Sequence, residues 1–209
     1  MVGPMQQPDS LAPISARVAR RHDLDAVIDI LSVAFAHDPL WTWAFPDGNH
    51  RTVWWRLCIR SAMRYPSTWI TDEGSPASVW IPPDGCEMTP EEEAGIPRLI
   101  ETLCGDRSSV VMDLLGRFEH AHPRERPHYY LSMLGIRPER RGQGLGIALL
   151  ADNLARVDEA GMPAYLESSN PANNARYARL GFHQVGEFTT PDRQHTVATM
   201  WREPVPAAE

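Results

Sequence analysis

The sequence has few cysteines and no long apolar run, and each absence narrows the class of protein. Its 209 residues include three cysteines, Cys58, Cys86 and Cys104, and none of them belongs to a CxxC pair. Their odd number and wide spacing argue against a disulfide framework or a zinc site and favour reduced thiols. No apolar segment approaches the ~20 residues that a membrane span needs.

The chain also lacks an excess of positive charge and a recognisable targeting segment. Its net charge of −7 at pH 7 argues against a general nucleic-acid binder. Residues 1–14 contain no basic end followed by an apolar core, so we expect a flexible tail in place of a signal peptide. We therefore expect a cytoplasmic protein with neither a nucleic acid nor a membrane as partner, and a second short tail over residues 204–209.

The most informative segment is a basic, glycine-rich turn. Residues 129–136 form an apolar run that ends at Arg137-Pro138, and a helical pattern begins near Ile147. Gly142, Gly144 and Gly146 lie where that helix starts. A helix N-terminus presents unpaired N–H groups and the positive end of the dipole, and glycine lets the backbone approach an anion closely. The segment therefore predicts a phosphate or pyrophosphate site.

The rest of the chain alternates short strand patterns with helical ones. We expect strands over residues 15–20, 68–71, 77–81, 128–136, 164–167, 183–188 and 196–202. We expect helices over residues 23–35, 50–64, 108–120 and 174–180, and a further helix that begins at the capping box of Thr89 and Glu92. Pro97 should break or kink that helix, and the aromatic segment 37–46 should form a loop. This order predicts an α/β fold with one mixed sheet and helices on both faces.

Three kinds of phosphate-binding turn compete for the glycine segment. A P-loop needs G-x-x-x-x-G-K-[ST], and the chain has no such run. A dinucleotide fingerprint needs a small residue at its last position, where this chain has Ile147 or Leu149. Only Glu167, at the end of the next predicted strand, favours that interpretation. The third pattern, R-x-x-G-x-G, is filled by Arg141, Gly144 and Gly146.

Two motifs together carry a resemblance to a known family. Leu134-x-Ile136-x-Pro138-x-x-Arg141-Gly142-x-Gly144-x-Gly146 resembles the acyl-CoA-binding motif of the GNAT superfamily of N-acetyltransferases. The segment Asn170 to Phe182, with Asn173, Tyr177 and Leu180-Gly181-Phe182, is similar to the superfamily's second signature. Within the superfamily, His128-Tyr-Tyr-Leu and Pro163-Ala-Tyr-Leu-Glu167 look closest to puromycin N-acetyltransferase and its relatives.

The resemblance implies a fold and a cosubstrate. The fold is a single-domain GNAT acyl-CoA N-acyltransferase fold over residues 15–203, with a mostly antiparallel sheet of about seven strands whose central strands splay apart. The cosubstrate is acetyl-CoA, and no metal is implied. The implied cofactor-binding residues are Leu134, Gly135, Ile136, Arg141, Gly142, Gln143, Gly144, Leu145, Gly146, Asn170, Asn173 and Tyr177. Gly135 also suggests a bulge or a close backbone approach within its strand.

Acetyl transfer from a thioester to an amine needs a base, an oxyanion donor and an acid. By the resemblance, Tyr177 is the acid that protonates the leaving thiolate. Glu167 is our first choice for the base, acting through water, and the alternatives are His128, His122, Glu119 and Asp38. A backbone N–H near Leu134 is the expected oxyanion donor.

The acceptor is expected at the aromatic segment, where Asp38, Trp41, Trp43 and Phe45 would bind a small-molecule primary amine. The same aromatics also fit a hydrophobic core. Two alternatives stay open: acetylation of a protein or peptide, and an acyl-CoA-binding sensor without turnover. A homodimer is a further option, because dimers are common among such enzymes.

Overall fold

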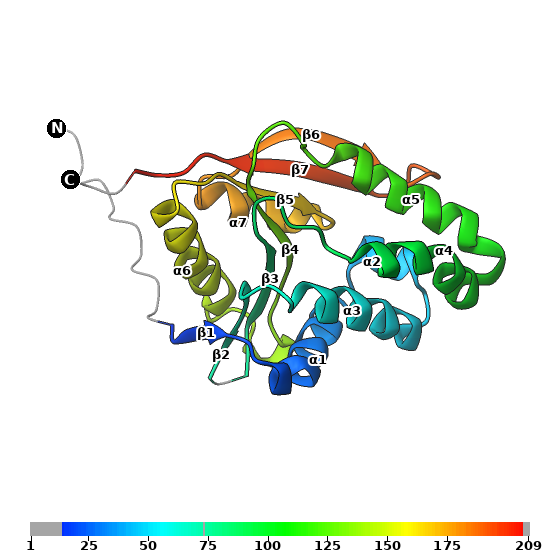
Figure 1. Cartoon of the computed structure of the whole chain (residues 1–209), viewed down its shortest axis with the longest axis horizontal. Helices are drawn as coiled ribbons and strands as arrows, with labels where there is room; N and C mark the ends of the chain where they lie inside the picture. The colour runs from blue at the N-terminus through cyan, green and yellow to red at the C-terminus, as the bar shows by residue number, and fades with distance from the viewer. Residues whose placement is uncertain (1–13, 73, 207–209) are drawn as a thin grey trace.

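Seven strands form one mixed sheet in the part of the chain that the computed structural model describes, residues 14–72 and 74–206 (Figure 1). The strand order is β1-β2-β3-β4-β5-β7-β6, and only β4 and β5 pair in parallel. The strands are β1 (Ala16–Val18), β2 (Thr68–Thr71), β3 (Ala77–Ile81), β4 (Tyr129–Gly135), β5 (Ala164–Ser168), β6 (His183–Thr189) and β7 (Thr196–Arg202).

Helices lie on both faces of this sheet, as the sequence predicted. The α-helices are α1 (Leu24–Ala34), α2 (Pro39–Ala44), α3 (Gly48–Ala62), α4 (Pro90–Cys104), α5 (Ser108–Ala121), α6 (Leu145–Glu159) and α7 (Asn174–Arg179). Short 3₁₀ turns are η1 (Arg21–Asp23), η2 (Gly105–Arg107), η3 (Pro138–Arg140) and η4 (Pro171–Asn173). None of the helices in the described ranges is both long and apolar enough to cross a bilayer.

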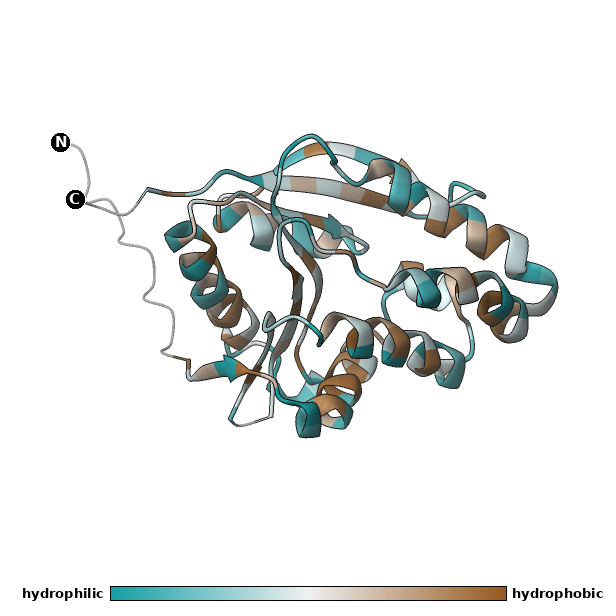
Figure 2. Cartoon of the chain, in the orientation of Figure 1, coloured by the Kyte–Doolittle hydropathy of each residue, from teal (hydrophilic) through white to brown (hydrophobic). Residues whose placement is uncertain are grey.

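The hydrophobic core is divided by the sheet into two clusters. One contains Val79 and Ile81 of β3 and packs under α1, α3, α4 and α5. The other contains Trp80 of the same strand and packs under α6. Successive side chains of a strand point to opposite faces, so a strand covered on both sides is apolar throughout. Figure 2 shows this arrangement as brown central strands between helices whose exposed sides are teal.

A β-bulge in β4 lies next to the point where the pairing of β4 with β5 ends. Residue pairing between β3 and β4 skips Ser132, because Val79 pairs with Met133 while Trp80 pairs with Leu131. As a result Leu131 and Met133, two residues apart, belong to opposite core clusters. The parallel pairing of β4 with β5 ends at Leu131 and Leu166. Beyond that pair the strands splay, as the family resemblance implied.

Most predicted elements are confirmed, and two expectations are wrong. The segment 37–46 is not a loop, because the Asp38 carboxylate accepts hydrogen bonds from the N–H groups of Leu40 and Trp41 and caps α2. Pro97 does not break its helix, because α4 runs without interruption from Pro90 to Cys104. The Thr89–Glu92 capping box and the packing of α4 against α5 offset a cost of about 3 kcal/mol for an internal proline.

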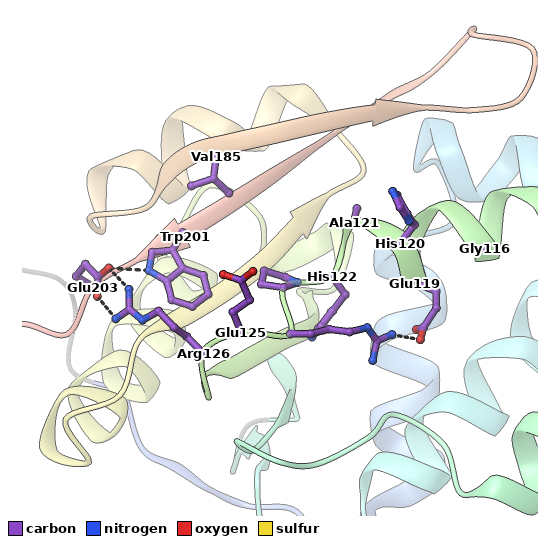
Figure 3. Close-up of a pocket in the computed structure, with 12 residues that line it drawn as sticks. Gly116, Glu119, His120, Ala121, His122, Glu125, Arg126, Val185, Trp201 and Glu203 are labelled. Carbon is purple, nitrogen blue, oxygen red and sulfur yellow. Dashed lines mark hydrogen bonds and ion pairs between the residues drawn. The ribbon is translucent and has the colours of Figure 1, made fainter.

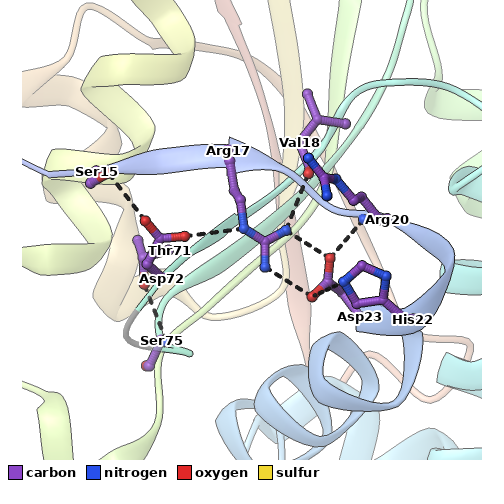
Figure 4. A network of polar contacts seen from close by, with 9 residues as sticks. All are labelled: Ser15, Arg17, Val18, Arg20, His22, Asp23, Thr71, Asp72 and Ser75. Atoms are coloured by element: carbon purple, nitrogen blue, oxygen red, sulfur yellow. Dashed lines mark hydrogen bonds and ion pairs between the residues drawn. The ribbon is translucent and has the colours of Figure 1, made fainter.

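An ion-pair network fixes the start of the domain to the sheet (Figure 4). The Arg17 guanidinium on β1 donates to both carboxylate oxygens of Asp23 at 2.7 and 2.9 Å, and to Asp72 at 3.1 Å. The hydrogen bonds from Arg17 hold the pKa of Asp23 well below its usual range. This network orients the first turn of α1. The tail predicted for residues 1–14 lies, apart from Ile14, outside the described residues, and so do residues 207–209.

Candidate active site

The glycine-rich turn is an open cradle at the N-terminus of α6. Gly142 and Gly144 have φ values of +81° and +74°, a backbone region that favours glycine. Gly144 is the N-cap residue, so the N–H groups of Leu145, Gly146 and Ile147 lack partners within the helix. A Cβ at any of the three glycines would meet no described atom within 4 Å. The cradle therefore fits a pyrophosphate, and Gln143 lies exposed at its rim.

Arg141 connects this cradle to the opposite face of the sheet. Its guanidinium donates to the carbonyl of Ala34, the last residue of α1, at 3.0 Å. A cation at a helix C-terminus is favourable both for the dipole and for the unpaired carbonyls. In this structure Arg141 anchors the turn to α1, and its contact with a phosphate stays a prediction.

The exposed edge of β4 begins where its pairing with β5 ends. Leu134 is in this segment and Ile136 follows it, and both are partly buried. Gly135 is required for packing, because a Cβ there would lie 2.7 Å from the Ala34 Cβ and 2.8 Å from the Leu31 Cδ2. Packing against the α1 side chains therefore accounts for Gly135, and its contact with a cofactor stays a prediction. The bulge lies three residues earlier, at Ser132.

Glu167 lies beside this splay and is held by two tyrosines. Its side chain is 2% exposed. The Tyr130 hydroxyl of β4 donates to Oε2 at 2.6 Å, and the Tyr165 hydroxyl of β5 donates to Oε1 at 3.0 Å. Burial, followed by the charge of Glu167, raises the pKa values of both phenols, so both stay protonated donors at neutral pH. The carboxylate is thereby oriented at the point where β4 leaves β5.

Two histidines lie next to Glu167, the partly exposed His122 and the buried His128. His122, at the C-terminal end of α5, places Nδ1 3.8 Å from Glu167 Oε1. Its Nε2 lies 3.2 Å from Nε2 of His128, whose Nδ1 lies 2.7 Å from the carbonyl oxygen of Arg126. Burial lowers the pKa of His128 and keeps that ring neutral. Both histidines were alternatives for the base in the sequence, and the structure places them behind Glu167.

Tyr177 lies on α7, where its partly buried ring contacts Phe182. Burial, followed by the charge of Asp38, raises the pKa of Tyr177 to about 12, so the phenol is neutral at physiological pH. Asp38 in turn accepts a hydrogen bond from the Ser169 hydroxyl at 2.7 Å, and Ser169 follows the end of β5. Tyr177, Asp38 and the end of β5 thus belong to one neighbourhood.

The aromatic segment is partly core and partly surface. Phe45 is 1% exposed and is assigned to the core, where it stacks on Trp54. Trp41 is partly exposed and contacts Trp55 and Phe118. Trp43 donates through Nε1 to Asp192 in the β6–β7 loop at 2.7 Å. Trp41 and Trp43 are therefore the aromatic residues of this segment that reach the surface.

The side chains of Asp38, Asn170 and Asn173 form hydrogen bonds with other groups of the protein. Burial raises the pKa of Asp38, and three hydrogen bonds commit its carboxylate to the α2 cap and to Ser169. The Asn170 side chain accepts from the N–H of Ala172, and that of Asn173 accepts from Arg176. Their predicted contacts with an acceptor or a cofactor stay predictions.

A second carboxylate near Glu167 escaped the sequence analysis. Glu87, in the segment between β3 and α4, accepts a hydrogen bond from the hydroxyl of Ser132, the bulge residue. Burial, together with repulsion from Glu167, raises the pKa of Glu87. No motif surrounds Glu87 in the sequence, so nothing marked it before folding. Across the described ranges, no three His, Cys, Asp or Glu side chains are grouped to hold a metal ion.

A cavity of about 990 Å³ opens on the far side of the histidine pair (Figure 3). It lies between the end of α5, the segment 121–126 and the β6–β7 hairpin. His120, His122, Arg126 and Trp201 are among its lining residues. Arg126 pairs with Glu203 at 2.8 Å and lies over the Trp201 ring.

Part of the sequence matches a known protein family. Residues 111–182, from α5 to the end of α7, match the model of the Acetyltransferase (GNAT) family. A mycothiol acetyltransferase of Paenarthrobacter aurescens (strain TC1) is 35% identical over 77 residues, which cover 34% of this chain. The matched part is 24% of that relative's length, so the chain corresponds to about a quarter of it.

Solved structures share the fold over nearly the whole chain. A Corynebacterium glutamicum structure, described as histone acetyltransferase HPA2 and related acetyltransferase, has a TM-score of 0.63 and 23% identity, with 94% of this chain and 99% of that one covered. A mosquito arylalkylamine N-acetyltransferase like 5b has a TM-score of 0.61 and 16% identity, with 91% and 100% covered. The likeness to puromycin N-acetyltransferase stays a prediction. The family model thus matches residues 111–182, and the solved structures share the fold of the chain.

Proposed function

We propose that this protein transfers an acetyl group from acetyl-CoA to a primary amine of a small molecule, within a ternary complex. The observation that carries the proposal is the splay of β4 from β5 beyond Leu131 and Leu166, with Glu167 beside it. An open anion cradle lies at one end of the splay and a buried acid–base cluster at the other.

The residues present fit an acyl-CoA. The backbone N–H groups at Gly142 to Gly146 would hold the pyrophosphate, since an open helix N-terminus favours an anion. The β4 edge at Leu134 and Ile136 would pair with the amides of the pantetheine arm, as an added strand does. When bound, acetyl-CoA supplies an activated acetyl group as a thioester.

Glu167 is the proposed general base. Its two tyrosine hydrogen bonds fix the carboxylate at the splay, where an ammonium must lose a proton before it can attack. A backbone N–H next to the Ser132 bulge is the proposed oxyanion donor, because a bulge interrupts the regular ladder.

Tyr177 is the proposed general acid. Its raised pKa of about 12 keeps the phenol protonated at neutral pH. A free thiol has a pKa of ~8.5, below that of the phenol, and burial raises the thiol pKa as well, which reduces the free-energy cost of proton transfer to the leaving sulfur.

The acceptor is proposed to enter beside Trp41 and Trp43. One relative in fold is named an arylalkylamine N-acetyltransferase, which is consistent with an aromatic-lined acceptor site. Another is described as a histone acetyltransferase and related acetyltransferase, so a protein acceptor is the alternative. A cytoplasmic location and a homodimer are further proposals of ours.

The test is release of free thiol from acetyl-CoA with a panel of arylalkylamines, aliphatic diamines and lysine peptides. We expect turnover with at least one small amine and little with the peptides. Turnover with peptides alone would assign the protein to the alternative class. Binding of acetyl-CoA without turnover on any amine would contradict the enzyme and favour a sensor.

A further inference from the structure

We propose that His122 takes the proton from Glu167 after each transfer and releases it into the cavity of Figure 3. The inference rests on the proposed acetyltransferase function and assigns the route by which its proton leaves. His122 acts through Glu167 and does not touch the reacting atoms, so it is a positioning residue.

The reaction requires such a route. Acetyl transfer from a thioester to an ammonium gives an amide, a thiol and one free proton. The ammonium N–H bond breaks and a Glu167 O–H bond forms. The carboxyl must then lose that proton before the next cycle. The Glu167 side chain is only 2% exposed, so direct loss to bulk water is hindered.

The hydrogen bonds around the histidine pair set the tautomer that a relay needs. A carbonyl only accepts, so the contact of Arg126 O with His128 Nδ1 requires a proton on that nitrogen. Neutral His128 then has a lone pair on Nε2, which accepts from Nε2–H of His122 at 3.2 Å. Neutral His122 is left with its lone pair on Nδ1.

That lone pair faces the base. His122 Nδ1 lies 3.8 Å from Glu167 Oε1, so a movement of roughly 1 Å brings the two atoms to hydrogen-bond distance. A protonated Glu167 can then donate its O–H to Nδ1, which breaks the O–H bond and forms an N–H bond. The low pKa of His128 keeps the second ring neutral, so the positive charge stays on His122.

The cavity provides the exit. The His122 side chain is 28% exposed and lines the cavity, whereas His128 is buried. The charged and titratable groups around His122 are Glu167 and Tyr165 on β5, Tyr130 on β4, His128, Glu87, and the cavity residues Glu119, Arg124, Glu125 and Arg126. Glu119 and Arg124 pair with each other, as do Arg126 and Glu203. Rotation of the protonated His122 ring about its Cβ–Cγ bond then carries Nδ1–H from Glu167 to the cavity, where water accepts this proton. The Nδ1–H bond breaks, and the Nε2–H tautomer is restored for the next cycle.

The test compares His122→Gln with His120→Gln. His120 lines the same cavity but is exposed on α5, two residues before His122. We expect His122→Gln to lower kcat by at least about 10-fold, to change the acid limb of the kcat–pH profile, and to regain activity with added imidazole. We expect His120→Gln to behave as the wild type, and both variants to bind acetyl-CoA normally. Wild-type kcat and pH profile in His122→Gln, or a loss that imidazole does not restore, would overturn the relay.

A second measurement does not depend on turnover. Nitrogen-15 spectra of the histidine rings should show the Nε2–H tautomer for neutral His122 and the Nδ1–H tautomer for His128. An Nδ1–H tautomer at His122 would overturn the relay even if the protein is an active acetyltransferase. Failure of the wild type to acetylate any amine would instead contradict the proposed function, and the spectra would still decide the tautomer.

Discussion

The two ends of the β4–β5 splay differ in the groups they present, which are backbone groups at one end and side chains at the other. The donor end is backbone: an open helix N-terminus, two glycines in the left-handed region and the edge of β4. The acceptor end is side chains: Glu167, two tyrosines, the histidine pair and Glu87. In the proposed function, the backbone N–H groups bind acetyl-CoA, which is the same in every reaction. The side chains at the other end can differ between proteins and so select the acceptor. This contrast explains why the donor can be proposed from sequence and the acceptor cannot.

The contrast predicts its largest effect at Glu167. We expect Glu167→Gln to lower kcat by about 10²- to 10⁴-fold, because the amide cannot accept the ammonium proton. The Kd of acetyl-CoA should not change, since Glu167 belongs to the acceptor end. Steady-state kinetics and titration calorimetry measure the two quantities, with Glu187→Gln on the exposed strand β6 as control. An equal loss of acetyl-CoA affinity would mean that the two ends are not separate.

At the donor end, Gly144→Glu should change the affinity for acetyl-CoA, which Glu167→Gln leaves unchanged. A carboxylate in the cradle repels the pyrophosphate and occupies its space, so we expect the Kd of acetyl-CoA to rise at least about 100-fold. Gly161→Glu is the matched control, because Gly161 has a φ of +63° and equally open surroundings at the other end of α6. Both variants carry about the same backbone strain, of order 1 kcal/mol. Unchanged affinity in Gly144→Glu would place the cradle elsewhere.

Tyr177 is predicted both to contact acetyl-CoA and to protonate its leaving thiolate, and its substitution tests which of these roles it has. We expect Tyr177→Phe to lower kcat about 100-fold with little change in acetyl-CoA affinity. Because the raised pKa of about 12 keeps the phenol protonated, wild-type kcat should show no loss from this group below about pH 11. Tyr129→Phe, at the start of β4, is the control. Full turnover of Tyr177→Phe at neutral pH would assign the proton donor to another group.

At the end of α6 away from the cradle, a largely buried ion pair joins this helix to β7. Arg202 of β7 donates to both carboxylate oxygens of Asp158, near the end of α6, at 2.6 and 2.7 Å. We expect Arg202→Met to lower the free energy of unfolding by about 2 kcal/mol, because it leaves a partly buried carboxylate unpaired. The exposed pair of Arg56 and Asp25 is the control, and Arg56→Met should cost under about 1 kcal/mol. Equal effects in urea titrations would contradict the distinction.

The smallest expected effect is on acid stability. Burial opposes ionisation of Asp158, but the hydrogen bonds from Arg202 outweigh it and lower its pKa, as those from Arg17 do for Asp23. A lowered folded-state pKa stabilises the protein above the unfolded value of ~3.9, and this contribution is lost as the pH falls further. The free energy of unfolding should therefore fall below about pH 4. Asp158→Asn should flatten that dependence, and an unchanged slope would contradict the assignment.

Local signals in the sequence predicted most of the fold. The β2–β3 hairpin, the capping box at Thr89 and the closing strands are each specified by neighbouring residues, and the structure confirms them. The two failures had different causes. Pro97 does not break α4, in part because this helix packs against α5, which the local sequence does not show. Helix α2 does have a local signal, the Asp38 cap followed by Pro39, which the aromatic residues obscured.

The sequence by itself predicted the donor end, because glycines that directly precede a helix form a local pattern. It also identified Glu167 and Tyr177 as candidates through their motifs. Only the tertiary structure decided that a bulge at Ser132 lies where the pairing of β4 with β5 ends, and that Glu87, His122, Tyr130 and Glu167 meet there from four different segments. Such a cluster depends on strand register and helix packing, which no short stretch of sequence encodes.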